Sequence, residues 1–432
     1  MKKVLIISYF FPPCNLTASQ RSMGWARYLK KQGWDPIVIT RNWDNHIATP
    51  NHIHKDSGVE LIHKVTDEYE AYYLPFKGNL RDRLYSKYGN TRFYLLRKVL
   101  SFIELLGSNV HKAFIPYSNL HAFALDYCKK HDDVKAIIVT GNPFEIFRFG
   151  YEIHKQTNMP WIADYRDDWT TSEVNDVSGF LNRFLLGLSK RSEKKWVGTS
   201  SCITTVSPYY AQKIGEFVRK PGHVLLNGFF EDDLKTFQNR VLYDDFTIVY
   251  NGMLYGSQQI EIFLAGFKKL VDENPEYRQR IKLQFPGILY LKDIAQRVQN
   301  FMIGYEDTLL LTERISREQV LEMQARAHLL LMVSHLGSKG IPSSKIYEYL
   351  GLGRPVLVCP GDDDILDETF SQYNLGFITN SSVETSDVLN TQFKRYLDGT
   401  YEKMQADTDY TAQFARSTQA KVMADLLNNV SE

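Results

Sequence analysis

The sequence predicts an α/β protein built from two doubly wound parallel-sheet domains that face a cleft. The chain has 432 residues, more than one hydrophobic core ordinarily serves. Short apolar runs alternate with segments of helical spacing, and the alternation restarts after an irregular, acidic stretch at residues 231–245. Strands that alternate with helices favour a parallel sheet with helices on both faces.

The first half of the chain supplies the first of these sheets. Its continuous apolar runs predict strands at residues 4–9, 36–40, 136–140, 161–164 and 202–206. Helical spacing predicts helices at 18–32, 145–155 and 181–197. We expect an N-terminal domain at residues 1–228, followed by a linker at 229–243.

The second half repeats the pattern. Strands are predicted at 246–250, 281–285, 309–312, 329–333 and 355–359, and helices at 259–273, 291–301, 317–326 and 345–350. We expect a second domain at 244–405 and a C-terminal helix at 406–432 that packs back toward the first domain. Ligands of open parallel sheets bind beyond the carboxyl ends of the strands, so the chemistry is expected in the cleft.

Composition narrows the class of protein. Lys and Arg number 51 against 50 Asp and Glu, so no overall field favours nucleic acid. The four cysteines lie far apart without metal-ligand spacing, which favours reduced thiols in a cytoplasmic protein. The apolar start predicts a buried strand rather than a signal peptide, and no uncharged apolar run is long enough to span a membrane.

The most informative segment is GIPSSKIYEYLGLGRPVLV, residues 340–358. Ser343 and Ser344 are typical of a helix start, with a serine as N-cap, and a helix N-terminus binds phosphate well. Lys345 in the first turn opposes the helix dipole unless an anion lies beside it. Glu348 suits the two hydroxyls of a ribose. The alternative is an ordinary surface pair of Lys345 with Glu348.

Within this segment, EYLGLGRPV resembles the signature of retaining family-4 glycosyltransferases, which have the two-domain GT-B fold. The resemblance implies that Glu348 holds the ribose of a nucleotide-sugar donor. Family members usually carry another glutamate eight residues earlier, where this sequence has Gly340.

The segment TIVYNGMLYGSQQIE, residues 247–261, resembles the strand and glycine turn that open the family's donor domain. The resemblance places Gly252 beside the donor phosphates. Met253 and Gln258 stand where the family often has Arg and Lys. Lys345 is the natural substitute for those charges. Arg314 is a weaker one, with a purely structural role as its alternative.

The start of the chain, VLIISYFFPPCNLTASQR, resembles the family's opening strand and loop but lacks the usual paired glycines. The backbone of Ala18 and Ser19 would then have to lie close to the donor phosphates, and Arg21 would supply a positive charge. Residues 140–150, 160–170, 200–214 and 225–230 look like the acceptor domain of the branch that builds bacterial surface polysaccharides.

Three charged residues, Asp164, Arg166 and Asp167, follow a predicted buried strand at the end that faces the expected cleft. We expect Asp164 or Asp167 to orient the acceptor hydroxyl and take its proton, with Arg166 fixing the carboxylates. The alternative is a structural salt bridge. No Asp-x-Asp motif is placed to hold a metal on a diphosphate, and Asp362 to Asp364 are expected to form a solvated turn. Activity without a metal or other cofactor is therefore expected.

Residues 77–112 are basic and aromatic, with only Asp82 and Glu104 as acids. Such a stretch can lie on an anionic membrane surface, which would bring the enzyme to a lipid-linked acceptor at the inner face of the cell membrane. A basic rim on the acceptor pocket is the alternative. As a whole, the sequence predicts transfer of a sugar, with retention, from a nucleotide sugar to a glycan or polyprenol-linked acceptor. A nucleotide-sugar epimerase and a non-catalytic binding scaffold are the rival interpretations.

Overall fold

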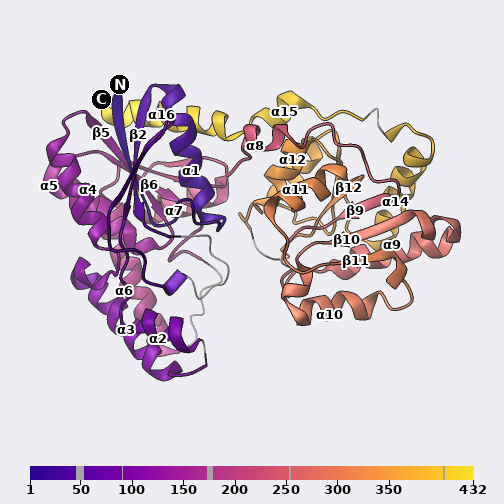
Figure 1. Ribbon diagram of the computed structural model, residues 1–432, viewed down its shortest axis with the longest axis horizontal. Coiled ribbons are helices and arrows are strands. Elements are labelled where there is room, and N and C mark those ends of the chain that lie inside the picture. Colours follow the sequence, from indigo (N-terminus) through magenta and orange to yellow (C-terminus); the bar gives the residue numbers. More distant parts are fainter. Residues whose placement is uncertain are drawn as a thin grey trace. The chain divides into compact units, whose positions relative to one another are not determined.

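The structure is a computed structural model that describes residues 1–44, 53–89, 91–172, 179–252, 254–335, 337, 339–401 and 404–432. The chain forms two compact units, each an α/β layer structure (Figure 1). Unit 1 comprises Met1–Leu226 and Gln419–Glu432, and unit 2 comprises Asn227–Thr418. Residues 229–243, expected to be a linker, therefore lie in unit 2, where they carry the short helix α8 (Glu231–Lys235).

Unit 1 contains an eight-stranded sheet in the order β3-β4-β2-β1-β5-β6-β7-β8. Its strands are β1 (Lys2–Ser8), β2 (Trp34–Arg41), β3 (Ile62–Val65), β4 (Glu70–Leu74), β5 (Val134–Gly141), β6 (Trp161–Tyr165), β7 (Cys202–Thr205) and β8 (Gly222–Val224). All neighbouring strands are parallel except β3 and β4, which pair antiparallel. The sequence did not predict β3, because all four of its residues are exposed and give no buried-strand signal.

The centre of this sheet is apolar on both faces. Val4, Leu5, Ile6 and Ile7 of β1 have no exposed surface, which explains why the strand is a continuous apolar run rather than an alternating one. The helices of unit 1 before its last one are α1 (Ala18–Tyr28), α2 (Leu80–Tyr88), α3 (Tyr94–Val110), α4 (Asn119–Lys130), α5 (Phe147–Thr157), α6 (Phe180–Val197) and α7 (Pro208–Val218). None of the helices within the described residues combines the length and the apolar character needed to cross a bilayer.

Unit 2 contains a six-stranded, wholly parallel sheet in the order β11-β10-β9-β12-β13-β14. Its strands are β9 (Phe246–Val249), β10 (Ile281–Phe285), β11 (Leu309–Leu311), β12 (Leu329–Met332), β13 (Val356–Val358) and β14 (Gly376–Ile378). Besides α8, its helices are α9 (Ile260–Glu273), α10 (Lys292–Phe301), α11 (Arg317–Arg326), α12 (Lys345–Leu352), α13 (Ile365–Gln372), α14 (Ser382–Leu397) and α15 (Thr408–Ala412).

This strand order reverses direction between β9 and β12. The chain moves outward through β10 and β11 on one side, and through β13 and β14 on the other. The connections after β9 and β12 therefore leave the sheet in opposite directions and open a crevice between them. Ligands of doubly wound sheets bind at such a switch point, beyond the carboxyl ends of the strands.

The last helix, α16 (Arg416–Ser431), returns the chain to unit 1 (Figure 1). The Leu226 N–H donates to Oε1 of Gln419 at 2.8 Å, and Nε1 of Trp34 donates to Oδ1 of Asn428 at 3.2 Å. The helix begins ten residues later than the expected bound at residue 406, because α15 and the turn after it belong to unit 2. Unit 1 thus contains both ends of this sequence.

Candidate functional site

The switch point of unit 2 brings together the ends of β9 and β12. Beyond β9 lie Tyr250 and Gly252, and beyond β12 lies His335, whose Nδ1 is 3.2 Å from Oγ of Ser257. Gln258 is 1% exposed, and its Nε2 donates to the Val333 carbonyl at 2.6 Å. This side chain fastens the connection after β9 to the end of β12, so Gln258 has a structural role where the family often has a cation.

Lys345, the first residue of α12, reaches across to the end of β9. Its Nζ donates to the Tyr250 hydroxyl at 3.1 Å and lies 4.3 Å from the centre of that ring. Gly252 has a φ of 94°, and a Cβ built there would lie 3.0 Å from Cε of Lys345. The backbone conformation and the close approach of the lysine both require glycine at this position. The structure thus brings together Gly252 and Lys345, two residues that the sequence singled out separately.

Burial lowers the pKa of Lys345 to about 7, because the apolar surroundings disfavour the ammonium form. Burial, together with the nearby Lys345 charge, lowers the pKa of His335. An anion beside Nζ would favour the ammonium and raise the lysine pKa again. The site therefore has a cation that is well adapted to a bound anion.

Tyr349, one turn after Lys345, anchors α12 at this place. Its hydroxyl donates to the Leu331 carbonyl of β12 at 3.3 Å and accepts from the Asn251 N–H at 3.4 Å. The side chain has no exposed surface, so its contacts with β12 and with the residue after the end of β9 are shielded from solvent. The N-terminus of α12 is consequently held beside the switch point.

Ser343 and Ser344 precede α12 as the sequence predicted, but neither acts as a capping side chain. Ser344 occupies the N-cap position with helical backbone angles (φ −63°, ψ −20°) and makes no side-chain cap bond. Capping serines adopt an extended backbone that turns the hydroxyl toward the first N–H groups, which these angles prevent. The expected serine cap is therefore wrong in its hydrogen bond, although the helix begins where expected.

Glu348 forms an ion pair that the sequence did not reveal. Its Oε1 accepts from Nη2 of Arg317 at 2.9 Å and from Nε at 3.2 Å, and Arg317 also contacts Asp233 at 3.2 Å. Both bonds use Oε1, and no other described residue donates to Oε2. The expected alternative of a Lys345–Glu348 surface pair is wrong, since the two side chains have different partners.

Two further donor-site candidates in this unit differ in their setting. Arg314 is exposed and lies over the Tyr290 ring, 5.1 Å from its centre. Gly340 has a φ of 76°, and its N–H donates to Oδ2 of Asp364 at 2.5 Å. The conformation at residue 340 favours glycine over the glutamate usual in the family. Met253 lies outside the described residues.

The acidic run after β13 is a helix cap rather than the solvated turn that we expected. Asp362 is half-buried and accepts from the N–H groups of Asp364, Leu366 and Asp367 at 2.9–3.2 Å. These bonds satisfy donors at the start of α13. Two of the three aspartates thus accept backbone hydrogen bonds within unit 2.

In unit 1, Asp164 forms the centre of a buried network. It lies inside β6 with no exposed surface, and Arg21 donates to it from Nη2 at 2.7 Å and from Nε at 2.9 Å. The carboxylate also accepts from Nε1 of Trp25 at 3.2 Å, from Oγ1 of Thr140 at 3.1 Å and from Oγ1 of Thr204 at 2.6 Å. The carboxylate thus joins α1 to three strands.

This network corrects two expectations. Asp164 lies inside the strand, which continues to Tyr165, and its hydrogen bonds go to the protein, so it cannot meet an acceptor hydroxyl without breaking them. Arg21 is 1% exposed and also donates to the Leu225 carbonyl at 2.8 Å, so its charge is directed inward rather than toward a ligand. The structural salt bridge, given above as the alternative, is the arrangement found.

Arg166 and Asp167 lie at the surface instead. Nη2 and Nε of Arg166 donate to Oδ2 of Asp167 at 2.7 and 2.9 Å, and 56% of the Asp167 side chain is exposed. Arg166 therefore fixes one carboxylate, not two. Of the three charged residues proposed for this position, Asp167 is the carboxylate that solvent and a substrate can reach.

Ala18 and Ser19 begin α1, after the loop that follows β1. The Ser19 N–H donates to the Leu16 carbonyl at 2.9 Å, and its hydroxyl donates to the same oxygen at 2.7 Å. Ser19 is 4% exposed. The expectation that its backbone contacts a ligand is therefore wrong for the N–H group, while Ala18 remains half-exposed.

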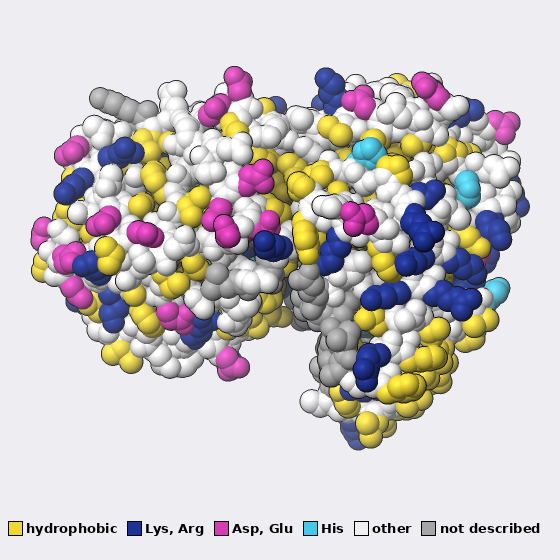
Figure 2. Space-filling model, turned by 180° about the vertical axis from the view of Figure 1, so that it is seen from behind, with side chains coloured by type: hydrophobic (Ala, Val, Ile, Leu, Met, Phe, Trp, Pro, Cys, Tyr) yellow, Lys and Arg dark blue, Asp and Glu magenta, His cyan; other side chains and the backbone are white. Residues whose placement is uncertain are grey.

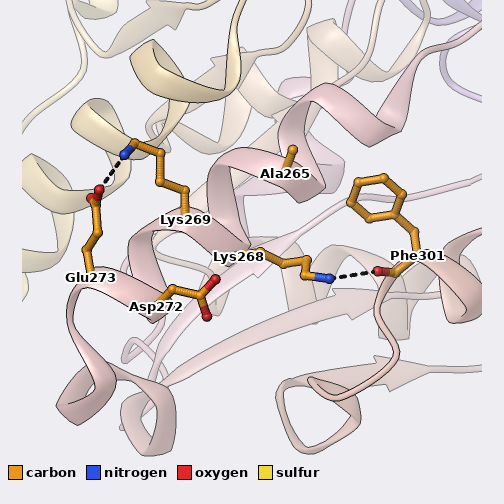
Figure 3. A pocket seen from close by; sticks show the side chains of 6 residues that line it. All are labelled: Ala265, Lys268, Lys269, Asp272, Glu273 and Phe301. Carbon is orange, nitrogen blue, oxygen red and sulfur yellow. Dashed lines mark hydrogen bonds and ion pairs between the residues drawn. The ribbon is translucent and has the colours of Figure 1, made fainter.

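Figure 3 shows a hollow in unit 2 that lies elsewhere. It is lined by Ala265, Lys268, Lys269, Asp272, Glu273 and Phe301. Lys269 pairs with Glu273, and Nζ of Lys268 donates to the Phe301 carbonyl at 3.3 Å. This half of α9 runs toward the amino ends of the strands, so the hollow is remote from the switch point.

Solved glycosyltransferases share this architecture along the whole chain. A UDP-forming α,α-trehalose-phosphate synthase from Burkholderia xenovorans is 11% identical, with a TM-score of 0.62 and 100% of both chains covered. HepE from Anabaena, solved with UDP and glucose, is 13% identical, with a TM-score of 0.56 and 99% of this chain and 100% of its own covered. A glycosyltransferase from Rickettsia africae is 12% identical, with a TM-score of 0.56 and coverages of 99% and 98%.

No protein-family model matches the chain, and no curated protein matches its sequence. At such low identities the similarity shows the fold, which is the GT-B arrangement of two parallel-sheet α/β domains. The expected fold class is confirmed in this respect. The antiparallel strand β3 is an addition at the edge of the first sheet.

Proposed function

We propose that this protein is a glycosyltransferase that binds a nucleotide sugar at the switch point of unit 2 and transfers the sugar to a glycan or lipid-linked saccharide. One observation carries the proposal: Nζ of Lys345 lies against Gly252 at the carboxyl end of β9, where a diphosphate would find both an open backbone and a cation. The UDP bound to the fold neighbour HepE supports a nucleotide as the ligand.

The surrounding residues fit the parts of such a donor. The diphosphate would accept from Lys345 and from the start of α12, where Ser343 and Ser344 supply hydroxyls that no other described residue uses. The ribose hydroxyls would donate to Oε2 of Glu348, which Arg317 holds in place through Oε1. Arg314 lies on the same side of the sheet, after β11, and is a peripheral candidate.

The transfer itself would need charge stabilisation more than a protein nucleophile. As the leaving diphosphate gains charge, Lys345 would stabilise it, and this is the same role that metal ions play in other transferases. We therefore propose transfer without a metal, with Asp167 orienting the acceptor hydroxyl, and with the retention that the family resemblance implies. Loss of transfer in a chelator, restored by magnesium, would refute the metal-independent part.

A role in the synthesis of cell-surface polysaccharides or other glycoconjugates rests on the resemblance of the acceptor domain to that branch of the family. The test of the whole proposal is a thermal-shift panel of UDP, GDP, ADP and their common sugars. A ligand that binds only the folded protein raises its stability by about 2.7 kcal/mol at 100 times its Kd. The stabilising donor is then incubated with and without saccharide acceptors.

The products distinguish the rivals. Sugar transferred to an acceptor supports the glycosyltransferase. An interconverted nucleotide sugar formed without any acceptor favours the epimerase, and binding without turnover favours the scaffold. If no nucleotide changes the melting temperature, the donor site at the switch point is wrong.

The lowered pKa of Lys345 gives the donor site a characteristic pH dependence. With a pKa of about 7, the lysine is largely neutral above that pH in the free protein, and the diphosphate must recruit a proton when it binds. Affinity is therefore expected to be highest below pH 7 and to fall as the pH rises toward 9. The nucleotide sugar is the right probe, because its diphosphate diester does not titrate in this range.

Calorimetry in two buffers of different ionisation enthalpy measures the expected proton uptake at pH 8. Lys345→Met should bind weakly and without uptake, and His335→Gln separates any contribution from the neighbouring imidazole. Equal affinity at pH 6 and pH 9, with no proton exchanged, would contradict proton uptake by Lys345 on binding.

A further inference from the structure

We propose that α3 and α6 of unit 1 together form a surface that binds an anionic lipid bilayer. This α3–α6 surface comprises exposed apolar residues, Tyr94, Leu95, Leu96, Val99, Ile103, Phe180, Leu181 and Phe184, and exposed basic residues, Arg92, Lys98, Arg183, Lys190, Arg191, Lys194 and Lys195. The proposal goes beyond the donor site, because lipid binding and sugar transfer are separate properties of different units.

Helix α3 carries apolar side chains on the side that should be polar. Leu95, Val99 and Ile103 follow at intervals of four residues and therefore lie along one stripe of the helix. Their exposed fractions are 76%, 54% and 49%. A surface helix of a globular protein normally turns such a stripe inward, and a contiguous exposed patch indicates a binding surface.

Helix α6 adds a second apolar element that the sequence pattern of residues 77–112 did not include. Phe180, Leu181 and Phe184 in its first two turns are 82%, 54% and 47% exposed. The two helices contact each other, and Oγ of Ser192 donates to Oδ1 of Asn109. The two helices are therefore neighbours in unit 1, and Figure 2 shows hydrophobic side chains gathered below a band of Lys and Arg on the part of unit 1 that carries α2 and α3.

The exposed charges of this surface have one sign. The only acids in residues 91–110 and 179–198 are Glu104, which is 20% exposed and pairs with Arg81 at 3.1 Å, and Glu193, which is fully buried and accepts from the Tyr165 hydroxyl at 2.9 Å. A basic surface that also exposes apolar side chains complements an anionic membrane.

Two arginines of the original basic stretch do not belong to this surface. Arg81 turns inward to Asp82 and Glu104, at the wall of a cavity of about 90 Å³ that also contains Glu145. Arg97 is 7% exposed. The basic stretch at residues 77–112 is thus divided: Arg81 and Arg97 turn inward, whereas Arg92 and Lys98 are exposed.

The aromatic and basic side chains are arranged as they are at membrane interfaces. Nζ of Lys98 lies 4.7 Å from the centre of the Tyr94 ring, and the Arg92 guanidinium lies 5.8 Å from that of Phe93. A ring that contacts apolar tails while its edge and a neighbouring cation contact headgroups suits this boundary. A second copy of the chain is the less favourable occupant, since a two-fold interface would bring the same positive charges together.

The test is sedimentation of the full chain with two kinds of vesicle, one of phosphatidylcholine alone and one that also contains about 30% phosphatidylglycerol. This fraction of anionic lipid gives a negative surface potential of roughly tens of millivolts. We expect binding to the anionic vesicles at low salt and its loss at high salt. Lys190→Glu/Lys194→Glu should weaken binding by on the order of tenfold or more. Leu95→Glu/Val99→Glu should weaken it further at the same salt.

Matched controls keep the test decisive. Lys129→Glu/Lys421→Glu makes the same charge change at exposed lysines elsewhere in unit 1, and Val241→Glu/Ile303→Glu makes the same apolar-to-acid change in unit 2. Both should bind as the wild type does. Wild-type protein that stays in solution with anionic vesicles, or control variants that lose binding equally, would overturn the proposal. So would a wild-type dimer that the Leu95→Glu/Val99→Glu variant converts to a monomer.

Discussion

Replacing Lys345 with methionine is expected to abolish the rise in melting temperature produced by the nucleotide sugar and to lower the transfer rate by about 10²–10³-fold. Methionine keeps most of the side-chain volume over the Tyr250 ring but removes the ammonium that lies beside Gly252. A half-buried cation placed where charge develops on a leaving group contributes more than a fully exposed one, because less water screens it.

The matched control is Lys394→Met, which makes the same change at an exposed lysine of α14 in the same unit. It should leave both measurements unchanged. Glu348→Gln is a second, independent variant. It keeps the shape of the side chain but makes it a weaker acceptor of hydrogen bonds from the ribose hydroxyls. The Kd of the nucleotide should therefore rise, while the contribution of its phosphates to binding is kept. Full activity of Lys345→Met would remove the main support for a donor site at this switch point.

Replacing Arg21 with methionine is expected to destabilise unit 1 by about 3–5 kcal/mol, because it leaves the Asp164 carboxylate buried without its cationic partner. For a unit of this size the melting temperature should fall by roughly 6–20 °C. Urea unfolding, followed by tryptophan fluorescence, measures the change, since Trp25 donates directly to Asp164.

Two further variants test whether the loss of stability comes from the unpaired Asp164 carboxylate. Arg166→Met breaks an exposed pair and should cost no more than about 1 kcal/mol. Arg21→Met/Asp164→Leu removes both charges and should be more stable than Arg21→Met alone, because no unpaired charge remains buried. An Asp164→Asn variant with wild-type stability and no transfer activity would instead support the catalytic role that the sequence suggested.

Periodicity and local apolar runs predict most of the two sheets. Strand β10 and helix α11 have the predicted bounds, because buried strands and capped helices carry their signals within a few neighbouring residues. Helix α1 ends four residues earlier than predicted, since residues 29–32 tighten into a 3-10 turn before Gly33, which has a φ of 89°. Strand β3 was missed because it pairs with the sheet without being buried.

The site was predictable only in part, for a related reason. The segment around Lys345 and Glu348 is continuous in sequence, so its helix, its charges and its place after β12 could be inferred. Partners could not. Asp164 finds Arg21 at a separation of 143 residues, and Glu348 finds Arg317 across 31 residues. A charged residue at the end of a strand gives the same sequence signal whether it serves catalysis or the core, and only its neighbours distinguish the two.

The return of α16 to unit 1 bears on how the protein is made. Unit 2 is one uninterrupted stretch, whereas unit 1 needs Gln419–Glu432 to complete its packing against Leu226 and Trp34. During synthesis the inserted unit can therefore finish folding while the surrounding one still lacks its last helix. The part of unit 1 that precedes unit 2 therefore waits for α16, whose Met423 and Leu427 are buried once the helix has packed.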